Sequence, residues 1–206
     1  MNMNNNQPMH ENMQTGSVPQ QFNHGGHEIF DVHEVLSGTI GTLDLYTMCK
    51  QHVQDQELND ILQRQYQFML DEYNITLEAF QTGQDPSKPT QSYKMTQGND
   101  FVYGLKQTQP KKPIQSANEI NDEVISGLVL SAHKSNASAK TLAALEATNP
   151  VLRRVLADSI PNCIEMAYEI AIYQNKHHYY QVPQLNSSDM QQILNSYAPG
   201  NKQMMQ

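Results

Sequence analysis

Residues 119–180 constrain the fold most, because two helical repeats are joined there by a single tight turn at Thr148-Asn149-Pro150. In each repeat, residues recur at alternating spacings of 4 and 3, which keeps one side of a helix against a partner helix. Asparagine caps helices well, and proline at the first helical position loses no hydrogen bond. We therefore predict an antiparallel helical hairpin. Its expected packing residues are Val124, Leu128, Ser131, Ser135, Ser138, Leu142 and Leu145, then Leu152, Leu156, Ser159, Cys163, Met166, Ile170 and Tyr173.

A second hairpin is expected earlier in the chain, over 27–83. Helical apolar spacing runs through 27–53 and 57–80, and Gly83 is placed to end the second helix in a left-handed conformation. When the sequence of the first hairpin is aligned with that of the second at an offset of 94 residues, Leu58 corresponds to Leu152. The two hairpins therefore read as a weak internal repeat.

Some residues fit a regular helix poorly. Gly38 and Gly41 lie inside the first helix, where glycine is unfavourable by about 1 kcal/mol relative to alanine, so another backbone is expected to approach closely there. Pro161 lies inside the fourth helix, so we expect a kink or break about one turn before it.

The connector over 84–116 contains four prolines and cannot be one helix. Because about 30 extended residues can run back along a helix of about 38 Å, the second hairpin can start beside the start of the second helix. The fold class predicted is all-α: a ferritin-like four-helix bundle of two helical hairpins, 27–83 and 117–180, with a long crossover connector. The connector is left open between an ordered strap and a disordered spacer.

The ends of the chain differ from this bundle, which we expect to occupy 27–183. Residues 1–26 are rich in Asn, Gln and Met without apolar periodicity, which predicts a disordered tail. Residues 184–206 are predicted to form a C-terminal tail with one short amphipathic helix, capped by Ser187 or Ser188.

Charge and hydropathy argue against two partner classes. The net charge is −8, and the isoelectric point is near 5.4, so no basic surface is expected for nucleic acid or anionic lipid. No apolar run approaches the roughly 20 residues of a membrane span. The N-terminus also lacks the apolar core of a signal peptide, so synthesis in the cytosol is expected.

Three carboxylates are the candidates for a metal site. Bundles of this topology often bind two metals through glutamates and Glu-x-x-His motifs, but the sequence contains no Glu-x-x-His. Subtracting 94 from the predicted packing residues of the second hairpin gives the corresponding positions of the first. Three of these are acidic, so Glu34, Asp44 and Glu72 are expected to face inward. Without a metal, these side chains should turn to solvent or pair with a buried Lys or His. A metal-binding ferritin-like oxidase or storage protein with a degenerate carboxylate site is therefore the alternative function.

Histidines and cysteines offer no clear catalytic set. His33, His52 and His133 stand singly on predicted helices, where structural roles are expected. Cys49 and Cys163 form neither a CxxC motif nor a disulfide framework, so we expect buried thiols. No catalytic or cofactor-binding residue is predicted.

The second hairpin resembles the coat F domain, a family of spore coat proteins from Bacillus and related endospore formers. The resemblance covers about residues 119–183 and, more faintly, the first hairpin; Pro161 departs from the continuous fourth helix expected for it. The residues that carry it are Asp122, Lys134, Glu146, the turn Asn149-Pro150-Val151-Leu152-Arg153 and the segment Tyr179-Tyr180-Gln181-Val182.

The resemblance implies a structural protein of the endospore coat rather than an enzyme. Its expected partners are other spore coat proteins, with homo-oligomerisation also open, and neither nucleic acid nor membrane. The expected location is the spore coat, after synthesis in the mother-cell cytoplasm. No cofactor is implied.

Overall fold

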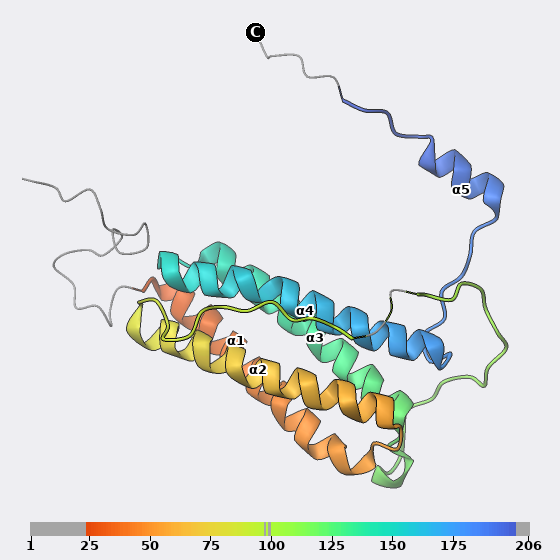
Figure 1. The fold of residues 1–206 in the computed structure, drawn as a ribbon, viewed down its shortest axis with the longest axis horizontal. Coiled ribbons are helices and arrows are strands. Elements are labelled where there is room, and N and C mark those ends of the chain that lie inside the picture. The colour runs from red at the N-terminus through yellow and green to blue at the C-terminus, as the bar shows by residue number, and fades with distance from the viewer. Residues whose placement is uncertain (1–23, 97, 99, 201–206) are drawn as a thin grey trace, which may run out of the picture.

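The computed structural model describes residues 24–96, 98 and 100–200, and four long helices dominate that part of the chain (Figure 1). These are α1 (Gly26–Cys49), α2 (Gln56–Thr82), α3 (Asp122–Glu146) and α4 (Pro150–Lys176). Short helical segments are η3 (Lys50–His52), η4 (Ala117–Glu119) and α5 (Ser187–Leu194). None of the described helices is both long and apolar enough to cross a bilayer. The tail predicted to be disordered lies, up to residue 23, outside the described residues.

The helices form a bundle in which α1 and α4 each lie beside α2 and α3. The connector runs back along the bundle, so α3 starts near the α1–α2 turn (Figure 1). There, the carboxylate of Asp122 accepts hydrogen bonds from the backbone N–H groups of Gln54, at 2.9 Å, and Asp55, at 3.1 Å. The structure thus confirms the predicted all-α bundle of two hairpins joined by a long crossover.

The connector is an ordered strap along α2 and α4 over much of its described length (Figure 1). Tyr93 is its buried anchor, and its ring meets Phe68 edge-on with centroids 5.2 Å apart. Phe101 packs against Tyr168 of α4, with centroids 5.5 Å apart. Three other apolar residues of the strap are mostly exposed: Val102, Tyr103 and Leu105.

The helix ends follow the capping residues in the sequence. The Asn149 side chain accepts hydrogen bonds from the first N–H groups of α4, and Gly83 ends α2 with φ of 65°. At α5 the cap is Asn186 rather than either predicted serine. The predicted break before Pro161 is not found, because α4 runs from Pro150 to Lys176 without interruption and the proline faces solvent.

The predicted packing face is right for α4 and wrong for α3. All seven predicted α4 residues are buried. On α3, however, Leu128, Leu142 and Leu145 are 47%, 56% and 79% exposed. The α3 interior face includes polar side chains, so apolar spacing alone misjudges its phase. The buried α3 residues are Ile125, Ser126, Val129, Leu130, His133, Asn136, Lys140 and Ala143.

Burial supports the internal repeat. Adding 94 to each of the nine buried residues of α2 gives a buried residue of α4, from Leu58 and Leu152 to Ala79 and Tyr173. Counterparts also touch, since Asn136 Nδ2 donates to Thr42 Oγ1 at 3.0 Å and 136 minus 42 is 94. The four helices therefore follow an approximate two-fold arrangement.

One of the two helical glycines lies at this contact. A Cβ on Gly38 would be 3.2 Å from Oδ1 of Asn136, so α1 approaches α3 closely there as expected. A Cβ on Gly41 would meet nothing within 4 Å, so no close approach explains that glycine.

Candidate functional site

Buried polar side chains run through the middle of the bundle and come from all four long helices. They replace the apolar interior that leucine-rich spacing predicts. Isolated polar groups are costly in such an interior, so their hydrogen-bond partners determine what the site can do. The principal members are Tyr46, Gln65, Glu72, His133, Lys140, Asn162 and Glu169.

Glu169 is the centre of the first cluster, which we call the Glu169 cluster and which includes Arg64, Gln65, Tyr93 and Thr96. Its carboxylate is fully buried and accepts from Arg64 Nη2 at 2.7 Å and from Gln65 Nε2 at 3.0 Å. The Tyr93 hydroxyl donates to it at 2.5 Å, and the Thr96 N–H donates at 3.1 Å. This one carboxylate therefore joins α2, α4 and the strap.

His133 extends this network to α1 and α3. Its Nε2 lies 2.8 Å from the Tyr46 hydroxyl and 2.9 Å from Gln65 Oε1. Burial and then the charge of Lys140 lower the pKa of His133 to about 3. Within the described part of the chain, Nδ1 has no hydrogen-bond partner. His133 is therefore a neutral structural histidine near pH 7, consistent with the role expected for it.

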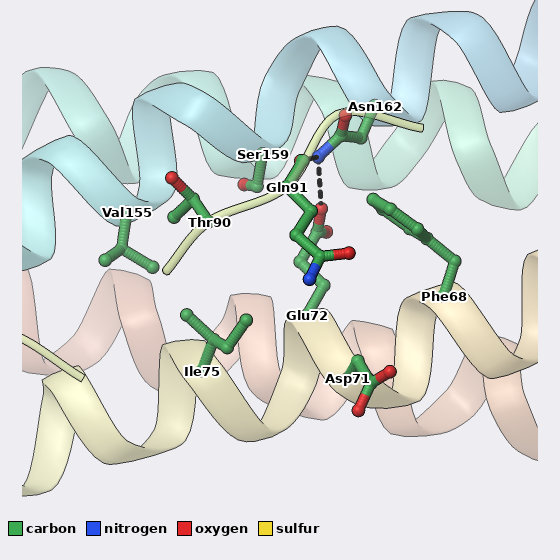
Figure 2. A pocket seen from close by; sticks show the side chains of 9 residues that line it. All are labelled: Phe68, Asp71, Glu72, Ile75, Thr90, Gln91, Val155, Ser159 and Asn162. Atoms are coloured by element: carbon green, nitrogen blue, oxygen red, sulfur yellow. Dashed lines mark hydrogen bonds between the residues drawn. The ribbon is translucent and has the colours of Figure 1, made fainter. Parts of the chain in front are cut away.

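Glu72 is the centre of the second cluster, the Glu72 cluster, with Lys140 and Asn162. Its carboxylate forms an ion pair with the Lys140 ammonium and accepts from Asn162 Nδ2 at 2.8 Å. Burial, the largest single influence, would lower the pKa of Lys140, but the charge and hydrogen bond of Glu72 together with those of Cys163 outweigh it, so the pKa is raised. Figure 2 shows Glu72 of α2 reaching Asn162 of α4 where the strap crosses. The adjacent hollow, between α2, α4 and the strap, holds about 20 Å³, room for about one water.

The structure does not bring the three candidate metal ligands together. Glu34 and Asp44 face solvent, whereas Glu72 is buried and paired with a lysine. Both outcomes named for these side chains, solvent exposure and pairing with a buried cation, therefore occur. Among the described residues, no three His, Cys, Asp or Glu side chains gather as metal ligands would.

The other singled-out residues take structural positions. His33 is exposed, and His52 is half-buried beside Gln51. Cys49 and Cys163 are buried free thiols, and burial raises the pKa of each.

Sequence reasoning missed Lys140 and Glu169 as members of the interior. The resemblance drew attention to Lys134, which is exposed. The 94-residue repeat held the missing signal for Lys140, because its counterpart is Tyr46, a residue of the predicted apolar stripe in 27–53. For Glu169, the counterpart Ile75 belongs to the apolar face predicted for 57–80.

Amide side chains bind the strap through its backbone. Asn162 accepts from the N–H of Tyr93 and donates to the carbonyl of Gln91, both at 2.9 Å. Asn175 binds both the N–H and the carbonyl of Val102, and Gln181 does the same with Lys106. We call these three amides the strap clamp: Asn162, Asn175 and Gln181.

The turn between α3 and α4 is tied to the first hairpin. Glu28 of α1 is fully buried, and its carboxylate accepts from the backbone N–H groups of Thr148 and Asn149. Burial alone would raise the pKa of Glu28, but hydrogen bonds with His24 and this turn lower it. Asn149 Nδ2 also donates to the carbonyl of Gly83, at 3.0 Å. The Asn-Pro turn thus fastens the two hairpins together.

The arrangement suits a structural role for the interior. The buried acids have cationic or hydrogen-bonding partners, and the links cross from helix to helix. Such networks fix how helices are placed relative to one another, because every alternative arrangement would strand a buried polar group.

Comparison with known proteins places this architecture in a family. Residues 121–183 match the model of the Coat F domain. The chain is 55% identical over 180 residues to spore coat protein F-like protein YhcQ of Bacillus subtilis strain 168, covering 87% of this chain and 83% of that protein. A crystal structure of a candidate spore coat protein from Bacillus halodurans C-125 has the same fold, with a TM-score of 0.57, 16% identity, and coverage of 82% of this chain and 99% of that one. The chain belongs to the Coat F domain family.

Proposed function

We propose that this protein is a structural component of the bacterial endospore coat, made in the mother-cell cytoplasm and acting through self-assembly and contacts with other coat proteins. The observation that carries the proposal is its 55% identity over 180 residues to a spore coat protein F-like protein. Identity at that level over most of both chains supports a shared role.

The site geometry supports a non-enzymatic role. Four charged groups of the two clusters form two ion pairs, Arg64 with Glu169 and Lys140 with Glu72. The hollow beside Glu72 has room for about one water. We infer that the network holds the bundle rigid, while the strap, the helix faces and the tails carry the contacts.

We further propose a division of the chain that follows from this role: a bundle over 27–183, flanked by an N-terminal tail over 1–26 and a C-terminal tail over 184–206. The bundle supplies a fixed unit. The tails extend the reach of each copy in the coat.

Location in sporulating cells tests the proposal. A fluorescent fusion expressed from the native promoter should appear in the mother cell and then encircle the forespore. Coat extracts of purified spores should contain the untagged protein, and a deletion strain is the control for the extract. Uniform fluorescence in the mother cell, with no protein in the coat fraction, would refute the proposed role.

A further inference from the structure

The helix α5 is amphipathic but has no partner in the described part of the chain. Its apolar side chains Met190, Ile193 and Leu194 recur at i, i+3 and i+4, the spacing by which a helix anchors itself in a groove, and Tyr197 follows three residues after its end. Figure 1 shows α5 standing apart from the bundle. The exposed fractions rise from 38% at Met190 through 55% at Ile193 and 66% at Leu194 to 84% at Tyr197.

A hollow of about 420 Å³ lies between α1, α2 and the turn that joins them. Its lining includes the buried residues Tyr46 and Leu62 and the half-buried Val53 and Tyr66. Exposed polar residues, among them Lys50 and Gln63, complete it. Pockets of about 300–1,000 Å³ hold drug-sized groups, so this hollow can take several aliphatic or aromatic side chains.

The hollow and α5 complement each other in charge. Lys50 is the one charged residue among those that line the described hollow. Asp189 is the one charged residue of α5, and it directly precedes the anchor Met190. An acidic side chain beside the apolar stripe of α5 can therefore meet the basic one that lines the hollow.

We propose that α5 of one copy docks into the hollow between α1 and α2 of a second copy. This inference rests on the proposed coat function and deepens it, because it names the partner and the contact. Donor helix and receiving hollow are different surfaces, so each docked pair leaves one free α5 and one free hollow. Such a head-to-tail contact extends into filaments unless the rotation closes a ring.

The tether of α5 favours a second copy over the same chain. Val182 is held beside the strap, because its carbonyl accepts from the N–H of Gly104 at 2.9 Å. Only four residues, 183–186, separate Val182 from the start of α5 at Ser187, a reach of about 18 Å. The hollow is lined by α1, α2 and their turn, and none of its lining residues belongs to the strap, beside which the tether starts.

A single tryptophan tests docking directly, because the sequence contains none. In Tyr197→Trp, the emission of the full-length protein should shift to the blue as the concentration rises, following the increase in sedimentation coefficient. A blue shift that does not change with concentration would mean that α5 folds onto its own chain, which overturns the proposal. Emission of an exposed indole at every concentration would overturn it as well.

Complementation tests the two surfaces separately. The α5 variant Ile193→Asp/Leu194→Asp and the hollow variant Lys50→Glu/Gln63→Trp should each weaken self-association by more than about tenfold. Both change exposed side chains, and thermal unfolding by circular dichroism checks the fold. Mixed together, the two variants should form a discrete dimer, because one retains the hollow and the other retains α5. The matched control Gln191→Asp/Gln192→Asp alters the polar side of α5 and should associate like the unaltered protein.

Failures of the two proposals are distinguishable. Association of the α5 variant at the unaltered strength, or a mixture that stays monomeric, would overturn the docking contact. A protein that reaches the spore coat but does not self-associate would overturn the docking contact alone. A protein that self-associates as described but stays in the mother-cell cytoplasm would overturn the coat role, with the contact retained.

Discussion

Lys140 of α3 and Glu72 of α2 form an ion pair across the interior of the bundle, between two helices that are not neighbours. Both side chains are buried. The pair therefore spans the diagonal of the bundle and links the two hairpins directly.

Removing one member of this ion pair should lower the free energy of unfolding far more than removing both. Lys140→Met leaves the buried Glu72 charge uncompensated, so we expect a loss of about 3–5 kcal/mol in the free energy of unfolding. Adding Glu72→Leu should restore much of that loss. Urea unfolding measures both, with Lys134→Met, at an exposed lysine of the same helix, as the control. Equal stability of Lys140→Met and the control would show that the ion pair contributes nothing.

The protein should lose stability in acid partly through His133. Its folded-state pKa of about 3 lies below the unfolded value of 6.5, so the stability it contributes is present above pH 6.5 and is lost as the pH falls towards 3. The slope for one such group is at most about 1.4 kcal/mol per pH unit. His133→Gln should therefore show a flatter decline between pH 6.5 and 4.5, measured by urea unfolding.

The exposed His33→Gln is the control for this pH dependence. It should leave the shape of the pH profile unchanged. If His133→Gln declines as steeply as the unaltered protein, the buried neutral histidine is not the source of the acid sensitivity.

The burial pattern of α3 predicts tolerance at residues that look like core leucines. Leu142→Ser and Leu145→Ser should each change the free energy of unfolding by less than about 0.5 kcal/mol, since both side chains are mostly exposed. Leu156→Ala, at a fully buried position of α4, should cost about 2–5 kcal/mol. Chemical denaturation of the three variants distinguishes the observed face of α3 from the one predicted by leucine spacing, which demands similar losses at all three.

Asn149 should contribute more to the stability of the fold than an ordinary helix-capping residue does. Asn149→Ala removes the acceptor for the N–H groups of Val151 and Leu152 and the donor to the carbonyl of Gly83. We expect a loss of about 2 kcal/mol or more in thermal or urea unfolding. Asn186→Ala removes a similar cap from the exposed α5 and should leave global unfolding unchanged; comparable losses in both variants would mean that the tie to Gly83 adds nothing.

Sequence patterns predicted the architecture well because the signals were local or strongly periodic. Asn149, Pro150 and Gly83 mark helix ends by their own backbone preferences, and α4 buries an apolar stripe that can be read directly. For α3 the same procedure chose the wrong side, since His133, Asn136 and Lys140 occupy buried positions. Their burial depends on partners in other helices, which spacing within one helix does not reveal.

The interior network was the least predictable part for the same reason. Glu72 was identified as an inward residue, but its partner Lys140 comes from the diagonal helix, 68 residues away. Glu34 and Asp44 were turned inward by an error in phase: their repeat counterparts, Leu128 and Ser138, are themselves exposed. The 94-residue correspondence between the hairpins agrees with the burial pattern, but the α3 packing face that was transferred to α1 through it was the wrong one.

The strap clamp has a consequence for how related proteins diverge. Asn162, Asn175 and Gln181 grip main-chain atoms, which every amino acid other than proline presents alike. Many side chains of the connector over residues 100–106 can therefore change in evolution while the path of the backbone there stays the same. The three amide side chains, which lie outside the connector, would hold its backbone in place whatever its side chains are. A tag or binding peptide inserted into the connector should therefore follow the native backbone path.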